Sequence, residues 1–69
     1  MATILTYDRR CGTDDIAECA AQIGDSLHTA VWIDALNPYR VHVASDPDTV
    51  RHWLVSEGFA LDEITVDPA

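Results

Sequence analysis

The segment 27–44, LHTAVWIDALNPYRVHVA, decides the fold because it contains two alternating runs separated by a turn signal. In 27–34, and again in 39–44, β-branched side chains alternate with polar, small or aromatic ones, which is typical of half-buried strands. The Asn-Pro dipeptide between the runs indicates a turn. The segment therefore predicts an antiparallel hairpin with one apolar face. The residues of that face are Thr29, Val31, Ile33, Val41 and Val43.

The opposite face of this hairpin carries Trp32, Arg40 and His42. When the valines share the inner face, the pleat requires Trp32 to lie opposite or diagonal to the two polar residues. A tryptophan on an outward sheet face predicts a protein contact, and a homodimer formed through the sheet is one form of it. The alternative is that a neighbouring loop or side chain partly covers Trp32.

A strand and a helix are expected before the hairpin. Residues 2–8 are rich in β-branched and aromatic types and predict a strand. Thr13 or Asp15 is expected to cap the start of the helix, and Gly24 is expected to end it. Asp15 and Glu18 have the spacing of a capping box. The apolar residues at helical spacing are Ile16, Cys19, Ala20 and Ile23.

A second helix and a last strand are expected after the hairpin. Ser45 is the expected N-cap, Pro47 occupies the first turn, and Gly58 ends the helix. Residues 59–66 predict a strand with a bulge or short turn at 62–63, because the apolar pattern changes phase there. The inner face of the helix consists of Val50, Trp53 and Leu54.

The resulting element order is β α β β α β. Two helices on one face of a four-stranded antiparallel sheet bury every apolar stripe in this order, which predicts an α+β fold. The order resembles the ferredoxin-like plait. Because 69 residues are too few for two cores, one domain spanning 1–69 is expected.

The charge is strongly acidic, with nine Asp and three Glu against four Arg, no Lys, and a formal net charge of -8. Such a surface repels nucleic acid and anionic membranes, so neither is expected as a direct partner. It attracts a basic groove on another protein or ribonucleoprotein complex. The alternative is that the acidity serves solubility, as in proteins of high-salt cytoplasms.

Carboxylates lie on the outward side of both predicted helices and near the C-terminus. If both helices pack on the same sheet face, these groups share an outward surface that imitates the phosphates of a duplex. The alternative is a solvated surface whose carboxylates serve as caps and favour the helix dipole. The expected partner-binding residues are Asp14, Asp15, Glu18, Asp25, Asp46, Asp48, Glu57, Asp62 and Glu63.

No catalytic, cofactor or metal motif is recognisable. There is no nucleophile motif and no glycine-rich phosphate loop, so we expect no enzyme activity and no cofactor. The spacing of the cysteines and histidines does not suggest a metal site. Cys11 follows Arg9 and Arg10, which would favour its thiolate, although two neighbouring aspartates oppose that field and an ordinary loop cysteine is the alternative.

The whole-chain profile, quoted as TDDIAE, SDPDTV and LDEITVDPA, resembles the phage-encoded anti-CRISPR proteins. The resemblance implies a small inhibitor that binds a CRISPR effector complex and blocks target DNA by charge mimicry, without turnover. It also implies the host cytoplasm as the location, and the absence of a secretory or membrane signal favours a cytoplasmic protein.

Two alternatives remain open. One is a halophile-type regulatory or ligand-binding plait domain that self-associates through its sheet. The other is an antitoxin-like or transcription-linked adaptor.

Overall fold

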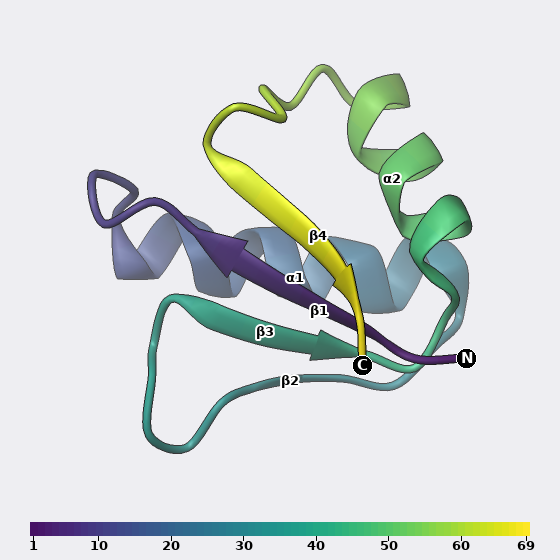
Figure 1. The fold of residues 1–69 in the computed structure, drawn as a ribbon, viewed down its shortest axis with the longest axis horizontal. Coiled ribbons are helices and arrows are strands. Elements are labelled where there is room, and N and C mark those ends of the chain that lie inside the picture. Colours follow the sequence, from purple (N-terminus) through teal and green to yellow (C-terminus); the bar gives the residue numbers. More distant parts are fainter.

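Two helices cover one face of a four-stranded antiparallel sheet in the computed structural model, which describes residues 1–69 (Figure 1). The sheet order β2-β3-β1-β4 places the first strand in the centre and confirms the predicted α+β, ferredoxin-like arrangement. Neither helix has the length and apolar character that a membrane span requires. The elements are β1 (Thr3–Tyr7), α1 (Thr13–Leu27), β2 (Val31–Ile33), β3 (Arg40–Val43), α2 (Pro47–Ser56) and β4 (Ile64–Pro68).

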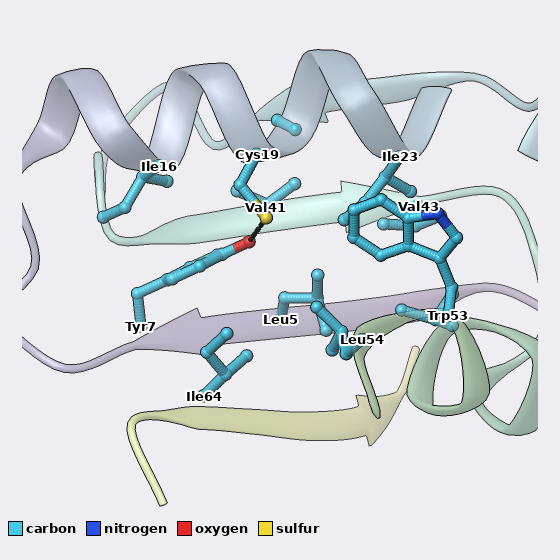
Figure 2. Packing of buried hydrophobic residues seen from close by; sticks show 12 residues of the cluster. Leu5, Tyr7, Ile16, Cys19, Ile23, Val41, Val43, Trp53, Leu54 and Ile64 are labelled. Atoms are coloured by element: carbon cyan, nitrogen blue, oxygen red, sulfur yellow. Dashed lines mark hydrogen bonds between the residues drawn. The ribbon is translucent and has the colours of Figure 1, made fainter. Parts of the chain in front are cut away.

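The core lies between the helices and the sheet, and Figure 2 shows side chains from both sides meeting there. All seven apolar helix residues that the spacing assigned to the inner faces are buried. A fully buried Leu, Ile or Val contributes roughly 1.5–3 kcal/mol, so this one cluster supplies most of the drive to fold. Its members are Leu5, Tyr7, Ile16, Cys19, Ala20, Ile23, Val41, Val43, Val50, Trp53, Leu54 and Ile64.

The ends of α1 differ from the prediction. The N-cap is Gly12 and no side chain caps it, so the capping box expected from Asp15 and Glu18 is wrong. Gly24 does not end the helix, which continues to Leu27. The terminating residue is His28, whose backbone is left-handed with φ of 50°. Residue 27 belongs to the helix, and His28 belongs to the turn after it. β2 therefore begins only at Val31 and not at 27 as expected.

The N-cap of α2 is Asp46 and not Ser45. The Asp46 carboxylate accepts hydrogen bonds from the Thr49 backbone N–H at 3.1 Å and from the Thr49 hydroxyl at 2.6 Å. These bonds lower the pKa of Asp46. Ser45 has another role, since its carbonyl accepts a hydrogen bond of 2.8 Å from the buried Thr3 hydroxyl. That bond ties the start of α2 to the central strand.

Gly58 follows the end of α2, as predicted, in a left-handed conformation with φ of 83°. The Gly58 N–H donates to the carbonyl of Val55, and the Phe59 N–H donates to the carbonyl of Leu54. This pair of bonds is a Schellman motif, which satisfies carbonyls that the helix leaves free. Phe59 then stacks on Trp53, with ring centroids 5.6 Å apart.

The last strand is shorter than predicted. β4 begins at Ile64, after a turn over 61–63, whereas a strand was expected from 59. The predicted interruption at 62–63 is therefore the turn that precedes the strand. Phe59 lies outside the strand because it packs back on α2, which the strand pattern alone did not indicate.

The hairpin register agrees with the prediction. Trp32 pairs with His42 and Ile33 pairs with Val41. The valines of β3 are fully buried, while Trp32 lies on the opposite, open face of the sheet.

Candidate functional site

All nine carboxylates expected to bind a partner are exposed. Asp46 is the N-cap of α2, and Asp48 lies 3.5 Å from the Arg51 guanidinium. The other seven make no side-chain hydrogen bond or ion pair within the protein. They are Asp14, Asp15, Glu18, Asp25, Glu57, Asp62 and Glu63.

Five of these carboxylates gather where α1 and β4 begin, and we call this group the acidic end: Asp14, Asp15, Glu18, Asp62 and Glu63. The start of β4 is held beside the loop before α1, because the Asp8 N–H donates a hydrogen bond of 2.8 Å to the Glu63 carbonyl. Asp15 and Glu63 line the same pocket. The sequence did not indicate this grouping, because it depends on which ends of the strands lie together.

The remaining four carboxylates lie elsewhere. Asp25 is on α1, about 16 Å along the helix axis from Asp14. Asp46 and Asp48 are at the start of α2, which in Figure 1 lies close to the N-terminus and far from the loop that precedes α1. Glu57 caps the other end of α2.

Two arginines lie near the acidic end, and each has a neighbour of its own. The Arg10 guanidinium is 2.8 Å from Asp8, a contact that raises the pKa of Arg10 and lowers the pKa of Asp8. Arg9 lies over the Tyr39 ring, 5.2 Å from its centroid. Six carboxylates, counting Asp8, therefore face two guanidiniums, and the acidic end keeps a negative excess.

On the open sheet face, Trp32 stacks against His42 with ring centroids 5.3 Å apart and planes 5° apart. Trp32 is 53% exposed, and the side chain of His42 covers part of it, as the alternative expected. The His42 Nε2 atom lies 2.9 Å from the Asp34 carboxylate, and this contact, with an N–H donated by Leu36, lowers the pKa of Asp34. Arg40 is exposed and has no ion pair.

Asp34 was not among the predicted site residues, although a signal for it existed. The alternation of 27–34 places Asp34 on the same face as Trp32, and the hairpin turn brings it to His42. The resulting cluster of Trp32, Asp34 and His42 is held by one stack and one hydrogen bond.

The thiol of Cys11 is not activated. Partial burial, followed by the charges of Glu63 and Asp8, raises its pKa, and these effects outweigh the lowering by Arg10. The field expected from the two arginines therefore does not produce a thiolate. Cys11 and Cys19 line one pocket of about 320 Å³ between the start of α1 and the loop before β4.

A buried polar pair in the core was not predicted. The Tyr7 hydroxyl donates a hydrogen bond of 3.1 Å to the Cys19 sulfur, as the dashed line in Figure 2 shows. Burial is the main cause of the raised pKa of both groups. Both are therefore neutral at physiological pH, and the pair satisfies a hydroxyl that burial would otherwise leave unpaired.

No three His, Cys, Asp or Glu side chains lie close enough to hold a metal ion. Comparison with protein-family models, with curated proteins and with solved structures found no match. The acidic end offers exposed negative charge, and the sheet offers the cluster of Trp32, Asp34 and His42.

Proposed function

We propose that the protein is a non-catalytic inhibitor that binds a basic, nucleic-acid-handling groove through its acidic end. The observation that carries the proposal is that the five carboxylates of this end are exposed and have no partner within the protein. Such groups attract Lys and Arg over long range and accelerate association. The resemblance to anti-CRISPR proteins makes the DNA channel of a CRISPR effector complex the target class.

The spacing on α1 supports charge mimicry in part. Asp14 and Glu18 are one helical turn apart, about 6 Å along the axis. One strand of a DNA duplex carries a charge every ~3.4 Å. The negative charge per unit length of Asp14 and Glu18 is therefore about half that of one DNA strand. The neighbouring Asp62 and Glu63 are needed to raise the charge of the surface.

The open sheet face favours a second candidate, a regulatory or ligand-binding plait domain. Trp32 and Arg40 are exposed there, with one side of the Trp32 ring covered by His42. Exposed aromatic and arginine side chains are enriched where one protein binds another. In this alternative the acidity serves solubility alone.

The test is competition between the protein and a labelled target duplex for a panel of guide-loaded CRISPR effector complexes at low salt. We expect the wild type to displace the duplex from one of them. The combined substitution of Asp14, Asp15 and Glu18 by Lys should weaken this inhibition by roughly tenfold or more. At 0.5 M NaCl its melting temperature should change little, because all three side chains are exposed and their charges are screened.

A matched control separates the acidic end from net charge. Replacing Asp25, Asp48 and Glu57 by Lys changes the charge by the same amount at other positions. We expect this variant to retain inhibition. Equal loss of inhibition in both variants would assign the effect to net charge. A wild type that displaces the duplex from none of the complexes would refute the proposal.

A further inference from the structure

The outer edge of β2 presents unpaired backbone groups. The Asp34 N–H bonds the Arg40 carbonyl, and the Ala44 N–H bonds the Ala30 carbonyl. In an antiparallel ladder hydrogen-bonded residues alternate, so Val31 and Ile33 direct their N–H and C=O groups away from β3. Since β2 is the end strand of the sheet, these groups point to solvent.

The two edges of the sheet differ in that β4 has a proline at an outward position and β2 does not. On β4, the Asp8 N–H bonds the Glu63 carbonyl, so by the same alternation Ile64, Val66 and Pro68 have outward backbone groups. Pro68 has no N–H, and a proline at an outward position blocks the pairing of a further strand. The β2 edge contains no proline and no charged side chain among its three residues.

Exposed apolar side chains occur on both faces of the β2 edge and in the turn that follows it. Ile33 is 40% exposed, Trp32 is 53% exposed, and Leu36 in the following turn is 96% exposed. A groove runs between this edge and α1, and small residues of the helix form its wall. The helix residues that line it are Ala17, Ala20, Ala21, Gly24 and Asp25.

A second copy of the chain fits this edge, because the three residues of β2 include no carboxylate that two copies would bring together. Two molecules of charge -8 repel each other, so they can associate only through a surface with few carboxylates. Asp25 is the one charged residue that lines the groove beside β2. None of the five carboxylates of the acidic end lines this groove.

We propose that two copies pair along β2 in an antiparallel register centred on Trp32. The outward groups require that Val31 of one copy pairs with Ile33 of the other, and the reverse, which forms about four hydrogen bonds. Trp32 then faces Trp32 of the second copy in a non-hydrogen-bonded pair, where side chains are closest. A two-fold axis normal to the sheet relates the copies and joins their sheets into one.

The side-chain contacts of this register are self-consistent. Each Trp32 already stacks on its own His42, so the open face gains a row of four rings across the junction. On the helix side, the two α1 helices flank the axis. Their alanines and Gly24 leave room for the backbones to approach.

The first test is sedimentation of Ile33→Pro, which removes an outward N–H without removing a bond to β3. The wild type should change with concentration from a species of 7.6 kDa to one of twice that mass. Ile33→Pro should weaken association by roughly tenfold or more, because two of the four hydrogen bonds are lost. Val66→Pro, the matched change on the β4 edge, should leave association unchanged. A monomeric wild type, or equal effects of the two prolines, would overturn the proposal.

The second test captures the register covalently and does not depend on proline. In a Cys11→Ser background, Trp32→Cys should form a disulfide-linked dimer with oxidised glutathione, because the Cα atoms of a non-hydrogen-bonded pair are about 4.5 Å apart. Arg40→Cys, on the same face but one strand inward, should remain monomeric on a non-reducing gel. A dimer of Arg40→Cys, or none of Trp32→Cys, contradicts this register.

Salt distinguishes this proposal from the proposed function. Association of two acidic copies should tighten as NaCl increases, because screening reduces their repulsion. Binding of the acidic end to a basic groove should weaken under the same change. The two proposals can therefore fail independently.

Discussion

His28 is the residue at which local sequence and structure disagree most. It is the only residue other than glycine with a positive φ, and it ends α1 four residues after the glycine that looked like the natural stop. Gly24 instead stays in the helix, where the Thr29 N–H bonds its carbonyl at 3.2 Å and Val31 lies close. A side chain in the left-handed region costs roughly 1–2 kcal/mol.

His28→Gly should therefore stabilise the protein by about 1 kcal/mol. His28 is exposed and makes no side-chain hydrogen bond or ion pair, so little is lost with its side chain. The measurement is the urea midpoint at fixed protein concentration. His28→Ala serves as the control, since it retains the backbone penalty and should match the wild type. Equal stabilities of the Gly and Ala variants would exclude this penalty.

At the scale of elements, α2 is the helix whose boundaries are best defined by side chains and backbone together. Asp46 caps its start, and the Schellman motif at Gly58 closes its end. A Cβ atom at Gly58 would meet nothing within 4 Å, so the requirement for glycine comes from φ alone. α1 has no side-chain cap at its start, and backbone bonds alone close its end, where the His28 and Thr29 N–H groups both donate to the Gly24 carbonyl.

Gly58→Ala should destabilise the protein by about 1 kcal/mol, because alanine is strained at φ of 83°. Gly58→Asn should lose less, since asparagine tolerates the left-handed region better. Chemical denaturation of the three proteins gives the order. An alanine variant as stable as the wild type would contradict the role of the motif.

At the scale of the whole molecule, the relevant quantities are the charge of -8 and the small size. The molecule extends 25 × 25 × 20 Å. At 0.01 M salt the Debye length is ~30 Å, so every carboxylate interacts with every other, whereas at 1 M it is ~3 Å and only close neighbours interact. Self-repulsion therefore opposes folding mainly at low salt.

The melting temperature should rise between 0.01 M and 0.5 M NaCl. The gain in melting temperature should be smaller in the variant with Lys at 14, 15 and 18. Each of the three substitutions raises the net charge by two, so together they change it from -8 to -2. Both proteins should carry Ile33→Pro, so that dimerisation does not contribute. A salt gain of the same size in both would show that self-repulsion is not its cause.

The sequence alone determined the number and order of the elements and the inner faces of the helices. Hydrophobic side chains recur with the period of the element that buries them, so Ile16, Ile23, Val50 and Leu54 could be placed in the core from spacing. The faces of the hairpin followed in the same way, because a slip by one residue would turn its valines to solvent, whereas the pairing of Trp32 with His42 came from the structure.

Only the tertiary structure decided the helix ends, the sheet order and the two candidate surfaces. Gly24 stays inside α1, where a Cβ atom would lie 3.5 Å from a methyl carbon of Val31 in β2, a contact between elements that no local pattern contains. The acidic end exists because β4 starts beside the loop before α1, which brings Glu63 to Asp15 across 48 positions of sequence. The open edge of β2 likewise results from strand order. Local periodicity reports what each segment buries, whereas the neighbours of a surface group are set by how the segments pack.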